Sequence, residues 1–319
     1  MPQPPGRSVV EAVLMGFAAG EALGLPASIS GETPPEPRPL PLGGVAAYGA
    51  ATEQALVLAE VLADNCGFNP SDFASRLAER ADVDNPVRLY SLATAEHIML
   101  VRRGYTWTEA RDMVASLEPP LDAVARAVVI PLFYTKERLV AEMAAAQLLT
   151  TSPDRRASVA ARAYALSLYY MLHGLPAVEA VEEAASQTPR QAIRDSLYAA
   201  IDAALSEPER LASIVAMPGD PLAQLLAAAA VAPLLASRGF DAWRALRASM
   251  AAAPPQAAHT AVAMAAALLA AAGGTVPVPV SLEAGPWVAR VSSKLSAANR
   301  SCRGVAGAEP AGSIAGSSK

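Results

Sequence analysis

Three glycines in the first apolar stretch of the chain constrain its fold more than any other feature. Gly16, Gly20 and Gly24 recur every fourth residue, so on a helix they lie on one face. Glycine inside a helix costs about 0.5–1 kcal/mol relative to alanine. That cost is offset where a stripe without side chains lets another helix backbone approach closely. The glycines therefore predict a helix that packs tightly against a second segment.

The residues around this stripe predict where the helix begins and ends. Ser8 is the expected N-cap, with Glu11 in capping-box spacing. Pro26 disfavours helical geometry at the residue before it, so we expect the helix to span residues 8–25. Residues 31–46 contain five prolines, which predict a long extended loop.

The composition favours helices throughout. Hydrophobic residues make up 53% of the 319 residues and aromatic residues only 5%, so Ala, Leu, Val and Met fill most of the core. Ala and Leu are strong helix formers, whereas β-rich folds use more β-branched and aromatic side chains. We expect a single compact all-α domain over residues 1–298 and a disordered tail over residues 299–319. Further helices are expected at about residues 50–63, 71–84, 87–103, 108–116, 121–134, 136–149, 154–172, 177–186, 190–205, 208–215, 221–236, 241–251, 255–272 and 283–295.

Several classes of protein are disfavoured. The net charge of −5, without a basic run flanked by aromatic residues, argues against a nucleic-acid partner. Cys66 and Cys302 are too few for a disulfide framework or a zinc site and are compatible with a reducing cytoplasm, where we expect the protein. No signal peptide is expected, because no apolar h-region precedes the first helix. Residues 222–235 and 260–280 are apolar but short or interrupted, so they predict buried helices and no membrane partner.

Three segments occur in an order that is typical of one enzyme family. They are Gly20-Glu-Ala-Leu-Gly-Leu-Pro-Ala-Ser28, Ala55-Leu-Val-Leu-Ala-Glu-Val-Leu62 and Pro255-Gln-Ala-Ala-His-Thr260. The first resembles Gly-Asp-Ala-x-Gly-x-Pro-x-Glu, the second the helix after Thr-Asp-Asp-Thr, and the third Gly-Gly-Asp-Thr-Asp-Thr. Over residues 8–296 the chain thereby resembles the all-helical ADP-ribosylglycohydrolase family, which includes dinitrogenase reductase-activating glycohydrolase and the J1 crystallins.

The resemblance implies a pair of magnesium ions that orient ADP-ribose for hydrolysis. Magnesium prefers oxygen ligands, and charged oxygens offset the free energy of its dehydration. At five positions of the family's acids this chain carries residues without a carboxylate: Ser28, Ala50, Ala51, Ala257 and His259. The hydroxyls of Thr52 and Thr260 remain, and two hydroxyls cannot hold two dications. We therefore expect that the magnesium site is lost and that no cofactor is bound.

Five residues are candidate ligand-binding remnants of such a site: Thr52, Thr260, Glu21, Glu53 and His259. Glu21 and Glu53 also have plainer structural interpretations. Glu21 on a glycine-rich helix more often pairs locally or faces solvent. Glu53 is adjacent to Thr52, but neighbours on a helix point about 100° apart. His259 is a possible transition-metal or phosphate ligand without a second ligand at metal spacing. No catalytic residue is predicted.

Two functions of different classes fit these features. The favoured one is a catalytically inactive ADP-ribosylglycohydrolase-like protein with a binding or structural role, whose ligand would be ADP-ribose or another nucleotide-like small molecule. The alternative is a hydrolase that removes ADP-ribose from modified proteins or small molecules through a non-standard metal site. A membrane-associated helical protein is a third and less favoured hypothesis.

Overall fold

The helices expected from the Ala- and Leu-rich sequence form in the computed structural model, which describes residues 3–216, 219–279 and 281–302. The all-α prediction is confirmed, since the described residues add only one two-stranded hairpin. The α-helices are α1 (Arg7–Ser30), α2 (Ala50–Asn65), α3 (Pro70–Arg80), α4 (Leu92–Arg102), α5 (Trp107–Met113), α6 (Leu121–Ala125), α7 (Ile130–Phe133), α8 (Glu137–Thr151), α9 (Arg155–Leu172), α10 (Ala177–Ser186), α11 (Gln191–Ser206), α12 (Leu211–Val215), α13 (Pro221–Ala236), α14 (Ala242–Ala252), α15 (Ala258–Ala271) and α16 (Gly285–Ser301). Short 3-10 turns lie at η1 (Pro86–Arg88), η2 (Arg126–Val129), η3 (Pro208–Arg210) and η4 (Pro255–Ala257), and the strands are β1 (Pro41–Leu42) and β2 (Val45–Ala46).

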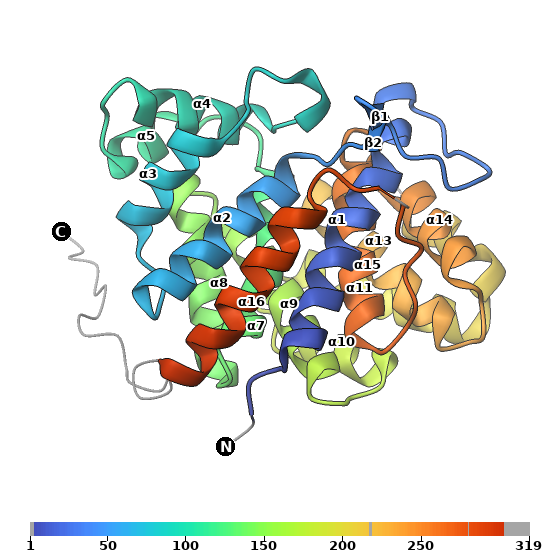
Figure 1. Cartoon of the computed structure of the whole chain (residues 1–319). Coiled ribbons are helices and arrows are strands. Elements are labelled where there is room, and N and C mark those ends of the chain that lie inside the picture. The colour runs from blue at the N-terminus through green and yellow to red at the C-terminus, as the bar shows by residue number, and fades with distance from the viewer. Residues whose placement is uncertain (1–2, 217–218, 280, 303–319) are drawn as a thin grey trace.

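The glycine stripe brings α1 against α15, as predicted. A Cβ on Gly20 would lie 2.5 Å from the Val262 carbonyl oxygen, and a Cβ on Gly24 would lie 2.5 Å from the His259 Cα. Neither position has room for a side chain. α15 in turn packs on α13 and α14, so it lies between α1 and these two helices (Figure 1). The stripe thus fixes the distance between the first helix and the helix that carries the last candidate motif.

The predicted ends of the first helix are wrong. Its N-cap is Gly6, without a side-chain hydrogen bond, rather than Ser8. The helix continues through Pro26 to Ser30, and Gly31 ends it with a left-handed φ of 75°. Pro26 removes only its own backbone donor, and the turn after it is held by contacts with α15. The tertiary packing therefore overrides the local preference of the residue before proline.

Several helices begin later than predicted, because a proline starts a separate 3-10 turn in front of them. The 3-10 turns η1, η3 and η4 each begin with a proline: Pro86, Pro208 and Pro255. The helix predicted at 87–103 begins only at Leu92, because Leu89 takes a left-handed φ of 52°. The helix predicted at 121–134 divides into α6, η2 and α7, with Pro131 in the last of these. Proline supplies the φ angle of a tight turn but no donor to continue one.

The proline-rich segment is non-helical, as predicted, but it is not extended throughout. Its last part forms the hairpin in which Pro41 pairs with Ala46 and Leu42 with Val45. The two turn residues, Gly43 and Gly44, both have positive φ (60° and 85°), which suits a two-residue hairpin turn.

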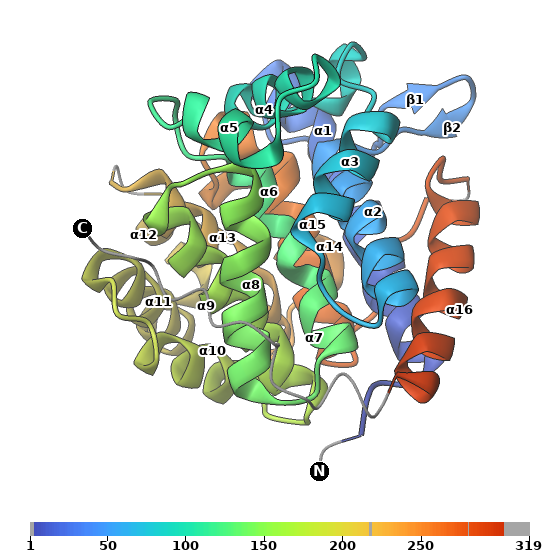
Figure 2. The same ribbon diagram turned by 90° about the vertical axis from the view of Figure 1, so that its left-hand side faces the viewer.

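Helices α3, α4 and α5 gather at one end of the molecule, next to one end of α8 (Figure 2). Buried Leu100, Ala110 and Val114 form a small hydrophobic cluster there, apart from the main core. The main core contains α9 and α13, whose alanines and leucines are almost all buried. The middle of α9, in the helix expected at 154–172, is therefore central in the fold.

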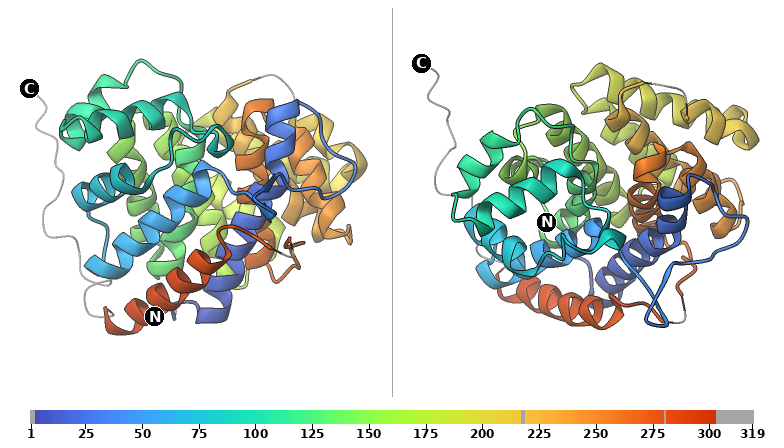
Figure 3. Two further views of the ribbon diagram at one scale, coloured as in Figure 1. Left: turned by 45° about the horizontal axis from the view of Figure 1, so that its top comes forward. Right: turned by 90° about the horizontal axis from the view of Figure 1, so that it is seen from above.

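The last described helix is longer than predicted. α16 continues to Ser301 and is followed by Cys302, which forms a disulfide with Cys66. The sequence alone did not indicate this pairing. The tail predicted over residues 299–319 therefore begins with helical residues, and residues 303–319 lie outside the described residues. α16 packs against both α1 and α2 (Figure 3).

α1 is the single helix of the described segments that is long and apolar enough to cross a membrane. In its most apolar window 72% is buried inside the fold, where α15 and α16 cover it. A helix in the core of a protein has this character too. The apolar segments around residues 222–235 and 260–280 correspond to α13 and α15, which are shorter.

Candidate functional site

Glu21 closes the N-terminus of α2 from a different helix. Its carboxylate accepts hydrogen bonds from the backbone N–H groups of Gly49 (3.0 Å), Ala51 (3.0 Å) and Thr52 (2.9 Å). The first N–H groups of a helix have no partner within the helix, and Gly49 at the N-cap has no side chain to supply one. Glu21 therefore acts as the N-cap of α2, and its negative charge lies at the positive end of the helix dipole.

This cap depends on the absence of side chains around the carboxylate. A Cβ on Gly49 would lie 2.6 Å from Glu21 Oε1, so only glycine leaves room for the acid. Glu21 is fully buried. Burial raises its pKa from 4.5 to about 7, although the hydrogen bonds from Thr52, Ala51 and Gly49 oppose the rise. Both carboxylate oxygens are already occupied by backbone donors.

Glu53 belongs to a different set of contacts. Its Oε2 accepts hydrogen bonds from the Asp82 backbone N–H (3.0 Å) and from the Tyr90 hydroxyl. Burial raises the pKa of Glu53, against the effect of the Tyr90 hydrogen bond. These contacts tie α2 to the loop after α3. Glu53 is thus held by structural contacts of its own, and none of its hydrogen bonds is shared with Glu21.

Ser28 and His259 form a hydrogen-bonded pair between α1 and α15. The Ser28 hydroxyl accepts a hydrogen bond from the His259 backbone N–H (3.0 Å) and lies 2.9 Å from its Nδ1. Nε2 of His259 lies 3.2 Å from the Thr260 hydroxyl. Burial lowers the pKa of His259 to about 4, so the imidazole is neutral at neutral pH. Both ring nitrogens therefore have partners within the protein.

A buried polar network that the sequence reasoning missed lies nearby. Asp122 accepts hydrogen bonds from Gln54 Nε2 (3.0 Å) and from the hydroxyls of Ser91 (2.6 Å) and Thr94 (3.1 Å). Its negative charge also partly opposes the lowering of the His259 pKa. A buried acid in the apolar run 121–133 is uncommon. An acid within this apolar run is the feature of the sequence that could have indicated the network.

The counter-charge of this network is Arg126, which is fully buried. Arg126 donates to Gln54 Oε1 (2.7 Å), Gln147 Oε1 (2.5 Å) and the Thr151 hydroxyl (2.7 Å). Asp122 and Arg126 are four residues apart on one segment, a spacing typical of paired charges. Burial lowers the pKa of Arg126 to about 9, which leaves it cationic at neutral pH.

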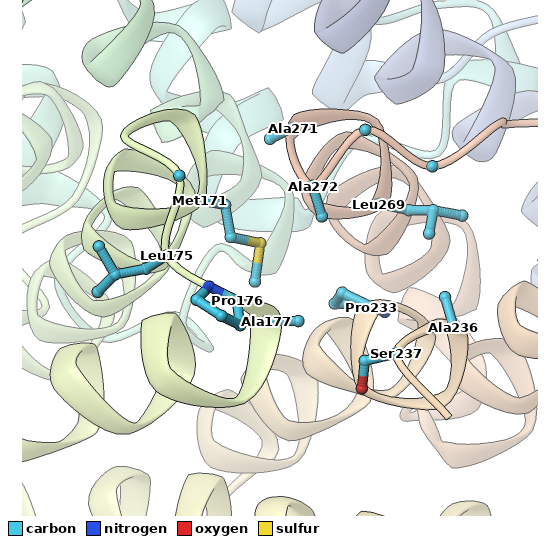
Figure 4. Close-up of a pocket in the computed structure, with 13 residues that line it drawn as sticks. Met171, Leu175, Pro176, Ala177, Pro233, Ala236, Ser237, Leu269, Ala271 and Ala272 are labelled. Atoms are coloured by element: carbon cyan, nitrogen blue, oxygen red, sulfur yellow. The ribbon is translucent and has the colours of Figure 1, made fainter. Parts of the chain in front are cut away.

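A cavity of about 600 Å³ lies away from these residues. It is bounded by the C-terminal ends of α9, α13 and α15 and the start of α10 (Figure 4). Met171, Pro176 and Pro233 project toward its centre, and no charged side chain lines it. Because His259 is near the start of α15 and this cavity is at its end, they are separated by about 20 Å of helix. The cavity is therefore not the predicted site.

A family model described as ADP-ribosylglycohydrolase matches residues 2–304. The chain belongs to the ADP-ribosylglycohydrolase family. A solved structure described as an ADP-ribosylglycohydrolase-related protein complex is similar to this family member with a TM-score of 0.66 and 24% identity. The match covers 92% of this chain and 98% of that chain, and at this identity it shows the fold alone. No curated protein sequence matches the chain.

At the positions that the resemblance assigns to the magnesium ligands, most side chains offer no oxygen atom. Ala50, Ala51 and Ala257 are buried and offer no oxygen ligand from their side chains. Glu21, the acid in the first motif, is committed to the end of α2. Within the described ranges, no group of three His, Cys, Asp or Glu side chains is placed to hold a metal ion.

The structure thus divides the five predicted site residues into three groups. Glu21 and the amide of Thr52 meet at the start of α2, while His259 and Thr260 meet at the start of α15. Glu53 lies in a separate contact with Tyr90.

Proposed function

We propose that this ADP-ribosylglycohydrolase family member is catalytically inactive and uses its helical scaffold for a binding or structural role. The observation that supports this most strongly is the three-fold capping of α2 by Glu21. In a hydrolytic site a carboxylate must be free to bind a metal or to move a proton. Here its lone pairs are directed at backbone N–H groups instead.

The pair at the start of α15 supports the same proposal. Ser28 and His259 hold each other by two contacts, at 2.9 and 3.0 Å, in the places where the family has acids. A neutral imidazole with both nitrogens engaged is a poor ligand for a hard cation such as Mg²⁺.

The ligand that we propose for a binding role is ADP-ribose or another nucleotide-like small molecule, without metal. The start of a helix is the usual place for a phosphate, but Glu21 already fills the first turn of α2. We therefore expect any such ligand to bind weakly and without help from magnesium.

The test is thermal unfolding of the full chain with MgCl₂, with ADP-ribose, and with both, together with release of ADP-ribose from an ADP-ribosylated protein. A ligand present at 100 times its Kd stabilises a protein by about 2.7 kcal/mol. We expect no synergistic rise in Tm with magnesium and ADP-ribose, and no release. A clear rise with both, accompanied by magnesium-dependent release, would support the hydrolase alternative and overturn the proposal.

A restored variant provides the matched positive control. It combines Ala50→Asp, Ala51→Asp, Ala257→Asp and His259→Asp, and its counterpart carries Asn at the same four positions. If these positions correspond to the family's ligands, isothermal titration should detect magnesium binding to the Asp variant alone. Absence of binding to a folded Asp variant would show that the assignment of these positions is wrong.

A further inference from the structure

The disulfide between Cys66 and Cys302 joins two helix ends that are 236 residues apart in the sequence. Cys66 follows the last residue of α2, and Cys302 follows the last residue of α16. Their Cα atoms are 5.4 Å apart, within the range that a disulfide spans. The bond thus closes a loop from residue 66 to residue 302 and fixes the C-terminal end of α16.

Cys66 occupies a backbone position that does not favour cysteine. Its φ of 52° is left-handed, and the residue after a helix in this conformation is usually Gly or Asn. Packing does not explain the choice either, since Cys66 is only half-buried. The bond to Cys302 is the contact in the structure that accounts for a cysteine here.

α16 covers the two helices that carry Glu21 and its N–H partners. Val288, Val291 and Leu295 of its inner face are buried, and the helix lies along both α1 and α2 (Figures 1 and 3). Side chains also fix this segment along its length: Glu283 with Arg88, Trp287 with Glu60, Lys294 with Asp64, and Asn299 with the Leu132 carbonyl. The ion pair of the buried Arg88 fixes the N-terminal end, and the disulfide fixes the other end.

We propose that Cys66 and Cys302 form a reversible redox clamp, which closes α16 over α1 and α2 when oxidised and frees the C-terminal half of α16 when reduced. In a reducing compartment the clamp is open, and in an oxidising one it is closed. This inference is independent of whether the protein hydrolyses ADP-ribose.

The chemistry of opening is thiol–disulfide exchange with a dithiol. Cys302 is buried, with 2% of its surface exposed, so the attacking thiolate reaches Cys66 Sγ. The S–S bond breaks, Cys302 leaves as a thiolate and takes up a proton, and Cys66 carries the mixed disulfide. The second thiol of the reagent then displaces Cys66. The dithiol supplies two electrons and two protons and becomes a cyclic disulfide. A small disulfide such as oxidised glutathione reverses both steps.

The test uses the full chain equilibrated with oxidised glutathione or with dithiothreitol. Oxidised protein should resist alkylation at both cysteines. Reduction should lower the Tm by roughly 5–10 °C and speed amide exchange by roughly tenfold in the last turns of α16, while α13 is unaffected.

Two variants make the result specific. Cys302→Ala should behave like reduced wild type under both conditions. Lys294→Ala removes another contact between α16 and α2, the ion pair with Asp64, but should retain the redox response. Two alkylatable cysteines after oxidation would overturn the proposal. So would an oxidised protein whose α16 exchanges at the same rate before and after reduction, and this comparison needs the wild-type chain alone.

Discussion

At the scale of single residues, Glu21 shows how a buried acid of the candidate site is held by the backbone of a neighbouring helix. It lies in the segment where the family has its first acid, but its oxygens bind the backbone of α2. His259, where the resemblance places an acid of the family, likewise has a partner within the protein, Ser28. Both side chains are ionisable groups whose burial disfavours the charged form.

The raised pKa of Glu21 predicts a specific pH dependence of stability. The folded state holds the proton up to about pH 7, whereas the unfolded chain releases it near 4.5. The folded state therefore binds more protons between these values, and this contribution to the free energy of unfolding declines as the pH rises. We expect the free energy of unfolding of wild type, relative to that of Glu21→Gln, to fall by about 2–3 kcal/mol from pH 4.5 to pH 7.5.

Urea unfolding of both proteins at the two pH values measures this difference. The comparison with Glu21→Gln is needed because burial lowers the pKa of His259 and His97 to about 4. These two imidazoles act in the opposite direction, since their contribution is lost as the pH falls below about 6.5. A difference that is constant with pH would show that Glu21 stays ionised.

At the scale of secondary-structure elements, the contact between α1 and α15 leaves no room for side chains at Gly20 and Gly24. It positions both halves of the candidate site, because α1 carries Glu21 and Ser28 while α15 carries His259 and Thr260. The stripe of glycines lets the two backbones come together along the length of the contact.

Two glycine substitutions on α1 should therefore differ sharply. In Gly20→Ala the new Cβ would meet Val262 O at 2.5 Å and Ala266 Cβ at 2.6 Å. In Gly16→Ala the closest atom would be Ala266 O at 3.2 Å. We expect Gly20→Ala to lower the free energy of unfolding by about 1–3 kcal/mol despite its better helix propensity. Gly16→Ala should stay within about 1 kcal/mol of wild type. Chemical denaturation checks both, and equal stabilities would contradict the packing described.

At the scale of the whole molecule, a buried polar network joins helices that are far apart in the sequence. Arg126 bridges α2 and α8 through Gln54, Gln147 and Thr151. The same Gln54 contacts Asp122. A buried network of this kind is costly if one member is removed, because the remaining polar groups stay buried without partners.

Arg126→Met tests that connection. It keeps an unbranched side chain of similar length but leaves the Asp122 charge without its buried counter-charge. We expect a loss of about 3–5 kcal/mol in the free energy of unfolding. The control is Arg38→Met, which removes an exposed ion pair with Glu36 and should cost less than about 1 kcal/mol. A comparable loss in the two variants, measured by urea unfolding, would show that the network contributes little.

The helical class and the close packing at the glycine stripe could be predicted from the sequence, as could the lack of carboxylates at five positions of the motifs. These follow from composition, from the helical repeat and from the identity of single positions, all of which are local properties. The sequence also placed the starts of several helices too early, because prolines there formed separate 3-10 turns.

The contacts of the remaining polar residues could not be predicted without the three-dimensional structure. Glu21 finds its partners 28 to 31 positions away, Ser28 meets His259 across 231 positions, and Cys66 meets Cys302 across 236. Such pairings depend on how helices cross, and no local periodicity encodes that. The close packing of the glycine stripe could be predicted from the sequence because any helix can pack against it. A hydrogen-bonded pair requires one particular partner residue at one distance, and the sequence does not name that partner.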